Sequence, residues 1–273
     1  MSQLRCPICS APLTRTGRTY RCPSGHSFDI SKEGYVHLLP ANRMHSKAPG
    51  DDKGMAAARN RFLSGGWYAP LRDALCDLAL KHAGPAPQVL DSGCGEGYYT
   101  AGLWQALTEA GRSVSMAGID ISKFSLRWAA KRAPEVEFAV ASAYRLPVAG
   151  QSVDLLVNCF SPLGLEEFRR VLRPGGWFFY VVPAPEHLWE LKTVLYEEPY
   201  PNPEESIPYD GFRCEEVRPV EACLSLTGPE VIHDLFQMTP YYWKTPKSGA
   251  ERLAGLERLE VRAAFRIHVF QRE

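Results

Sequence analysis

Apolar residues in the middle of the chain occur in short runs that alternate with helical patterns. The runs typical of strands are VLD at 89–91, SVSMAGID at 113–120, VEFAVASAYRLP at 136–147, SVDLLVNCFSP at 152–162 and WFFYVVPAP at 177–185. The helical patterns are SKFSLRWAAKRAP at 122–134 and EEFRRVLRPGG at 166–176, the second closed by its Pro-Gly-Gly. Strands that alternate with helices predict an α/β fold with a doubly wound, mostly parallel sheet. Its ligand is expected at the carboxyl ends of the strands.

The C-terminal part shows a different pattern. RPVEACLSL at 218–226 and EVRAAFRIHVFQR at 260–272 alternate between apolar and polar residues, as strands do. A helix is expected between them, over Glu230 to Gln237. No repeat and no low-complexity segment interrupts the chain.

A glycine-rich turn follows the first apolar run in PQVLDSGCGEGYYT. Gly93, Gly95 and Gly97 form G-x-G-x-G before a helix expected to start near Tyr98. Glycines let the backbone approach a ligand, and several nucleotide-binding folds share such a turn. The loop contains no Lys or Arg, so a positively charged cofactor without phosphate fits better than a dinucleotide. Asp120 ends the next strand, in a suitable place for a ribose diol.

The chain begins with two closely spaced pairs of metal-ligand residues. Cys6 and Cys9 form C-x2-C, and Cys22 and His26 form C-x3-H, with 12 residues between the pairs. Four such donors suit a tetrahedral Zn²⁺, and a full set of protein ligands predicts a structural site. A segment of roughly 30 residues cannot build a sufficient hydrophobic core, so the metal would hold its fold together. The alternative is a set of buried free cysteines.

Length and composition then set the domain plan. The 273 residues, 45% of them hydrophobic, allow one large domain and a small accessory one. We expect a zinc-binding module over 1–35, a linker with a helical segment over 36–70, and the α/β domain over 71–273. No export signal and no membrane span is evident, and cysteines without an export signal favour a reducing compartment. We therefore expect a cytoplasmic protein.

Charge is uneven although the net formal charge is zero. Residues 1–61 contain 10 Lys and Arg against 4 Asp and Glu, whereas the rest contains 21 against 27. A basic N-terminal part indicates contact with a polyanion, and a solvated basic face is the alternative. The module's own cations are Arg5, Arg15, Arg18 and Arg21, and a further set is Arg43, Lys47, Lys53, Arg59 and Arg61.

The central motifs resemble a known family when they are taken together. The order D-x-G-C-G-x-G from Asp91, the acidic end of the second strand and R-V-L-R-P-G-G at 170–176 resemble class I S-adenosylmethionine-dependent methyltransferases, over roughly 86–182. This resemblance implies a Rossmann-like sheet with an antiparallel edge strand. It also implies that Asp120 binds ribose, that Ser142 and Ala143 border adenine, and that Asp91 and the turn from Gly93 to Gly97 lie beside the methionine part.

A second resemblance extends over nearly the whole chain. The segments that carry it are CPICSAPL, YRCPSGHSFDISKEGYVHLLP, PGDDKGMAAARNRFLSGGWYAPL, PEHLWELK and FQMTPYYW. They are similar to bacterial 23S rRNA guanine-N1 methyltransferases, which modify hairpin 35 of domain II. The resemblance implies that Tyr68 and His187 line the cofactor site with Gly95 and Glu96, and it makes a homodimer plausible. A half-buried aromatic and a polar helix start are the alternative roles of Tyr68 and His187.

The expected chemistry constrains the acceptor side. Guanine N1 lies on the Watson–Crick edge, so the base must be unpaired or flipped out before it reacts. Asp51 and Asp52 are candidates to accept the N1 proton or to bind the guanine edge, and helix capping is the alternative for Asp52. Asn158 is a candidate to orient the base and to contact the cofactor. Candidates for stacking on the base are Phe160, Tyr241, Tyr242 and Trp243, with core packing as the alternative for the last three.

Two other functions remain open on the sequence alone. One is a small-molecule methyltransferase whose zinc module only stabilises the fold. The other is a non-catalytic RNA-binding protein that keeps the cofactor as a structural element. The basic module counts against the first, and the intact glycine turn with Asp120 counts against the second.

Overall fold

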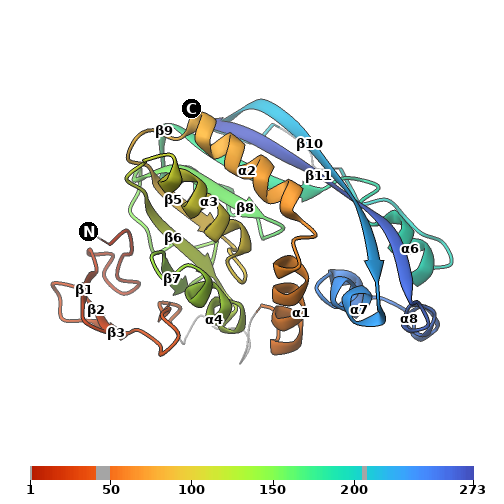
Figure 1. The fold of residues 1–273 in the computed structure, drawn as a ribbon. Helices are drawn as coiled ribbons and strands as arrows, with labels where there is room; N and C mark the ends of the chain where they lie inside the picture. Colours follow the sequence, from red (N-terminus) through yellow and green to blue (C-terminus); the bar gives the residue numbers. More distant parts are fainter. Residues whose placement is uncertain (1, 41–49, 205–207) are drawn as a thin grey trace.

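A twisted sheet of eight strands runs through the molecule, in the order β10-β11-β9-β8-β5-β6-β7-β4 (Figure 1). The computed structural model describes residues 2–40, 50–204 and 208–273. The strands of this sheet are β4 Val36–His37, β5 Gln88–Ser92, β6 Ser115–Asp120, β7 Glu137–Val140, β8 Val153–Cys159, β9 Leu172–Pro183, β10 Phe212–Thr227 and β11 Arg258–Arg272. No helix within the described ranges is long and apolar enough to cross a membrane.

The strand directions confirm the predicted class I methyltransferase sheet. The strands from β4 to β9 pair in parallel, whereas β11 is antiparallel to both β9 and β10. The antiparallel strand therefore lies second from the edge rather than at it, because β10 covers its outer side. The predicted strand at 136–147 is also shorter: β7 ends at Val140 and the chain then turns, with Arg145 N donating to Ser142 O over 3.1 Å.

Helices cover the sheet and build two cores. They are α1 Lys53–Ser64, α2 Ala69–His82, α3 Tyr98–Glu109, α4 Lys123–Arg132, α5 Leu165–Val171, α6 Trp189–Leu195, α7 Pro229–Gln237 and α8 Lys247–Ala254, with a 3-10 helix η2 Pro240–Trp243. Successive side chains of a strand point to opposite faces, so Val89 joins a core with α2 and α3 while Leu90 joins a second core with Phe168 of α5.

The N-terminal module supplies part of the second core. Its small antiparallel sheet consists of β1 Thr14–Thr16, β2 Thr19–Arg21 and β3 Ser27–Asp29. Leu4, Leu13 and Tyr20 are buried in the same cluster as Leu90 of β5. The connection from β7 to β8, residues 141–152, contains no helix. The module thus covers a part of the sheet that this connection leaves open.

Hydrogen bonds fix the module to the sheet edge. Tyr20 OH donates to Glu137 Oε1 over 2.8 Å, and Gln3 N donates to Glu137 Oε2 over 2.9 Å. Arg5 N donates to Pro147 O over 2.7 Å. The stretch 36–70, expected as a linker and a helix, also joins the sheet: Val36 and His37 form β4 alongside β7 before α1 follows.

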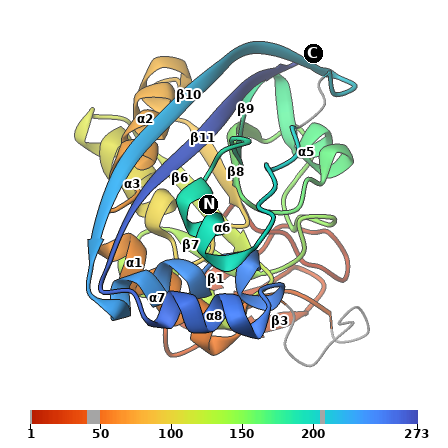
Figure 2. The same cartoon turned by 90° about the vertical axis from the view of Figure 1, so that its right-hand side faces the viewer.

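The β10–β11 pair forms a long, bent arm beyond the rest of the sheet (Figure 2). The chain between its strands forms α7, η2 and α8 at the tip of the arm. There α7 packs against α1, and α8 packs against α6. The C-terminal arm therefore brings its tip back to the carboxyl ends of the central strands.

Candidate functional site: a zinc ribbon beside an acidic cofactor cavity

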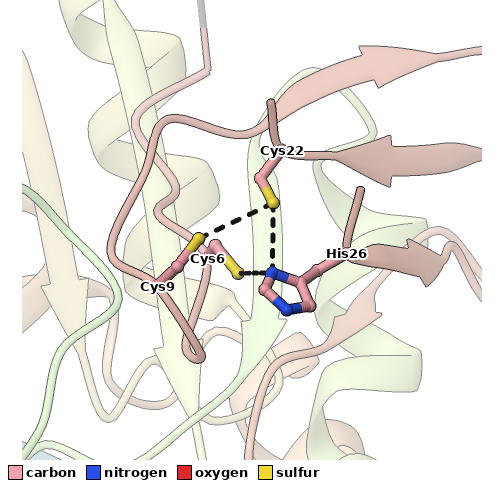
Figure 3. Close-up of side chains that lie close together, drawn as sticks. All are labelled: Cys6, Cys9, Cys22 and His26. Carbon is pink, nitrogen blue, oxygen red and sulfur yellow. Dashed lines mark hydrogen bonds between the residues drawn. The ribbon is translucent and has the colours of Figure 1, made fainter. Parts of the chain in front are cut away.

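The four predicted metal ligands converge at one point (Figure 3). Their ligand atoms all lie within 4.8 Å of one another. Cys22 Sγ lies 3.3 Å from His26 Nδ1 and 3.7 Å from Cys9 Sγ, and Cys6 Sγ lies 3.6 Å from His26 Nδ1. Zinc bonds of about 2.3 Å place neighbouring tetrahedral ligands roughly 3.5–3.8 Å apart. Cys6, Cys9, Cys22 and His26 thus fit a structural Zn²⁺, as predicted.

The glycine turn begins where β5 ends. Gly97 has φ +79° and precedes α3, and a Cβ there would lie 2.9 Å from Ala129 of α4. Gly97 therefore lets two helices approach each other and does not line the cavity. Gly95, with φ +55°, has no atom within 4 Å of its notional Cβ and does line the cavity. The backbone is thus open to a ligand at Gly95.

A cavity of about 630 Å³ lies at the carboxyl ends of the parallel strands. This volume is within the usual range of small-molecule sites. Nine of the predicted cofactor residues line it: Tyr68, Asp91, Gly93, Gly95, Glu96, Asp120, Ser142, Ala143 and His187. They come from distant parts of the chain and meet here because parallel strands end on the same side of a sheet.

Carboxylates give the cavity its chemical character. Asp91 is 2% exposed; its Oδ2 accepts a hydrogen bond of 2.6 Å from Thr100 Oγ1, and its Oδ1 has no partner in the described chain. Burial raises the pKa of Asp91 to about 7. Burial also raises the pKa of Glu96, which is 2% exposed. A buried acceptor without a donor indicates that a ligand donor or cation belongs beside it.

Asp120 occupies the end of β6. Its carboxylate accepts hydrogen bonds from Gly95 N over 2.9 Å and from Ser122 N over 2.7 Å. Burial raises the pKa of Asp120 to about 6, and these two backbone donors oppose the rise. The carboxylate is therefore held rigidly against the glycine turn, where a ribose diol can donate to it.

Tyr68 and His187 form an aromatic wall with Phe265 of β11. The Phe265 ring centroid lies 4.9 Å from that of Tyr68 and 4.7 Å from that of His187. Burial lowers the pKa of His187 to about 3, so the imidazole is neutral, and its Nδ1 lies 2.9 Å from Ala264 O. The Tyr68 hydroxyl is buried without a partner among the described residues. Both residues line the cavity, although the chain separates them widely.

Asp51 and Asp52 have different environments despite being adjacent. Asp51 lines the cavity and forms an ion pair with Arg59 of α1. Asp52 instead caps α1, because its Oδ1 accepts a hydrogen bond of 2.8 Å from Met55 N. The capping alternative for Asp52 is thus what the structure shows. Asp51 alone of the two faces the site.

Arg59 belongs to the site, not only to the basic set expected to contact a polyanion. It lines the cavity and donates to Met238 O over 2.9 Å. Arg61 is likewise engaged, since it pairs with Asp234. The one available signal was helical spacing, because Arg59 lies one turn from the buried Met55 and Phe62. Arg43 and Lys47 lie outside the described residues.

Asn158 is fully buried and does not line the cavity. Its Nδ2 donates to Ser92 O over 3.0 Å and to Pro162 O over 3.2 Å. The amide thus joins the end of β5 to the loop that follows β8. It shapes the two segments that line the cavity, Gly93 and Phe160 to Pro162.

These features fit S-adenosylmethionine, whose sulfonium and ammonium groups are cationic. The acidic lining around Asp91 and Glu96 suits those charges, and the open glycine turn with Asp120 suits the nucleoside. When bound, the cofactor supplies a methyl group activated by the sulfonium charge. We infer this fit from the unpartnered Asp91 oxygen and from the donor set, both of which belong to the protein itself.

Comparisons with known proteins agree with both halves of this site. A family model described as RlmA, N-terminal, a zinc ribbon, matches residues 4–47. A model described as Methyltransferase domain matches residues 89–176.

Several curated proteins are similar over most of the chain. A 23S rRNA (guanine(748)-N(1))-methyltransferase of Streptomyces fradiae is 40% identical over 70% of this chain and 67% of its own length. A putative 23S rRNA (guanine-N(1)-)-methyltransferase of Micromonospora griseorubida is 40% identical over 71% of this chain and 70% of its own. Another putative member, YxjB of Bacillus subtilis (strain 168), is 31% identical over 95% of this chain and 94% of its own.

The fold, the acidic cavity and the Cys₃His cluster define an S-adenosylmethionine-dependent methyltransferase that carries a zinc ribbon. The curated relatives are similar over most of the chain, and this identifies the family within that class. The chain belongs to the 23S rRNA (guanine-N1)-methyltransferase family.

Proposed function

We propose that the protein transfers a methyl group from S-adenosylmethionine to N1 of one guanine in hairpin 35 of 23S rRNA. The family supports the reaction and the rRNA, and the resemblance over nearly the whole chain is what implies hairpin 35. A homodimer belongs to the same proposal, and light scattering of the purified protein tests it.

The observation that carries the proposal is the set of free cations on the zinc module. No carboxylate of the described residues forms an ion pair with Arg5, Arg15, Arg18 or Arg21; Arg15 and Arg18 instead donate to backbone carbonyls. The loop 141–148 connects the module, at Arg5, to the cavity. Its first residues line the cavity, and at its far end Pro147 O accepts from Arg5 N. A polyanion held on the module would therefore extend to the cavity.

Two exposed aromatics at the cavity suit an extruded base. Phe160 is 46% exposed and Tyr144 is 66% exposed, and both line the cavity. Phe160 has φ +53°, a left-handed conformation that is costly for a bulky residue and common at functional sites. Stacking on such rings holds an unpaired base.

Asp51 is our candidate to accept the guanine N1 proton. It faces the cavity, and its pairing with Arg59 fixes its side chain. Asp52 and Asn158 support the site indirectly, the first by capping α1 and the second by joining the strand ends. A protein group can bind N1 or remove its proton only by contacting the Watson–Crick edge of the base. A guanine exposes that edge only when it is extruded from the helix.

Methyl transfer to RNA tests the proposal. The purified protein is incubated with methyl-labelled cofactor and a transcript of domain II, and the product is mapped by nuclease digestion and by reverse transcription. We expect label in one guanine of hairpin 35 and a stop there, because an N1 methyl group blocks base pairing. Label only on small metabolites would support a small-molecule methyltransferase, and RNA binding without transfer would support a non-catalytic binder.

A further inference from the structure

A fully buried lysine contacts two residues that line the cavity, Asn202 and Tyr241. Lys192 of α6 is 0% exposed, and α6 packs against β11 and α8 (Figure 2). Its Nζ donates to Tyr200 O over 2.8 Å and to Asn202 Oδ1 over 2.9 Å. The same nitrogen lies 5.2 Å from the ring centroid of Tyr200 and 5.3 Å from that of Tyr241. A buried amine with these partners is a costly arrangement that needs a reason.

The lysine fixes which way the Asn202 amide points. An amine with its hydrogens toward Oδ1 requires an acceptor there, and Tyr241 OH also donates to this oxygen, over 3.2 Å. On the other side, Asn202 Nδ2 donates to Ala184 O over 3.0 Å. A flipped amide would put donors against donors, so only one orientation satisfies the network.

This orientation leaves one hydrogen-bond donor for the cavity. Asn202 and Tyr241 both line the cavity, together with residues of the glycine turn. One amide hydrogen of Asn202 is used by Ala184 O, and the second has no partner among the residues described. The Asn202 oxygen already accepts two hydrogen bonds. Toward a ligand, the side chain is therefore a donor and not an acceptor.

We propose that Asn202 donates this hydrogen bond to the exocyclic oxygen O6 of the acceptor guanine, with Lys192 as the residue that positions it. The inference rests on the proposed function and names the group that selects the base. As the proton leaves guanine N1, negative charge spreads from N1 onto O6. A fixed donor at O6 stabilises that charge when it forms.

The same donor discriminates against adenine. Adenine carries an amino group at C6, which would face the Asn202 amide hydrogen with a donor instead of an acceptor. Flipping the amide to accommodate it would break the hydrogen bonds to Lys192, Tyr241 and Ala184 together. Unpaired buried donors of this kind can discriminate between ligands by several orders of magnitude.

Asn202→Asp is the decisive variant. The carboxylate keeps an acceptor for Lys192 and Tyr241 but offers no hydrogen to O6. We expect kcat on the hairpin 35 transcript to fall about 100-fold, the loss typical of one removed oxyanion donor. The carboxylate also loses the hydrogen bond to Ala184 O, so the melting temperature should fall modestly. The dissociation constant for the cofactor should stay close to wild type, which separates a lost donor from a misfolded protein.

Two further measurements separate donation from general damage. A transcript with 6-thioguanosine at the target offers sulfur, a weaker acceptor, so the ratio of wild-type to N202D rates should shrink to below about tenfold. Lys192→Met should lower kcat with little change in cofactor affinity, and adding N202D to it should cost little more. Additive losses in the double variant would overturn the role of Lys192.

The outcomes distinguish this inference from the proposed function. If the wild-type protein does not methylate the transcript, the proposed function fails. If it does and N202D works within about twofold of wild type, the donor role of Asn202 is overturned while the proposed function stands.

Discussion

The Asp91 carboxyl group makes cofactor binding depend on pH. Its pKa of about 7 means that below pH 7 the folded protein without cofactor holds a proton on Asp91, and a cationic cofactor must displace it. We expect affinity for S-adenosylmethionine to rise roughly 25-fold from pH 5.5 to pH 7.5 and then to level off. Isothermal titration calorimetry measures this rise together with the protons released.

Asp91→Asn removes the titrating group. The variant should bind the cofactor more weakly at pH 7.5 and should lose most of the rise with pH. Asp120, whose pKa is raised to about 6, accounts for what remains. An unchanged pH profile in the variant would show that Asp91 does not face the bound cation.

The adjacent aspartates give a matched pair of variants. Asp52→Ala removes the α1 cap and should lower the free energy of unfolding by about 1 kcal/mol, with little change in kcat. Asp51→Asn leaves the cap intact and should lower kcat. Urea unfolding and single-turnover methyl transfer measure the two effects. Equal loss of activity in both variants would count against a proton-accepting role for Asp51.

The sequence predicted some of the site residues and their roles, but not all of them. Asp51 and Asp52 were both candidates, with capping as an alternative for Asp52 alone, because the residue at which α1 begins decides which of them points into the cavity. Asp120 and the turn glycines were predictable, since strand-end acids and turn glycines share one edge of the sheet, whereas Tyr68 and His187 came only from the family resemblance. Asn202 carried no signal, because its role depends on a lysine ten positions earlier that is buried only by tertiary packing.

At the level of elements, periodicity predicted the parallel strands well and the edges of the sheet poorly. β4 has only two residues, too few for an alternating pattern, and it pairs with β7 because the module is fixed beside it. β11 lies inside the sheet because β10 pairs with its outer side. The hydrophobic pattern of neither strand predicts this pairing. Long-range pairing decides such positions, and local sequence does not.

For the molecule as a whole, zinc should stabilise more than the module. Leu4, Leu13 and Tyr20 share a core with the central sheet, so losing the metal exposes one face of the methyltransferase domain. We expect chelation to lower the melting temperature of the entire chain in a single transition. Cys9→Ser should do the same, whereas Cys223→Ser, at another exposed cysteine, should not. Two separate transitions would show that the module folds independently.

The cations of the module should determine how RNA binding depends on salt. Replacing Arg15, Arg18 and Arg21 with alanine should weaken binding of the hairpin and reduce the slope of log affinity against log salt by up to about 1 per residue. Arg213 and Arg258, which pair with glutamates on the β10–β11 arm, provide control variants. Filter binding at several salt concentrations measures the slopes, and equal effects in both sets would remove the module from the RNA contact.

The loop 141–148 borders the cavity with its first residues and the zinc module near Pro147, and α5 holds that module end. Glu167 accepts from Leu146 N over 2.7 Å, and Arg170 donates to the carbonyls of Leu146 and Val148. The segment that lines the cavity is therefore continuous with a fixed contact to the module. Binding of the cofactor in the cavity and binding of RNA to the module should therefore be coupled. Each ligand should change the affinity of the other by the same factor.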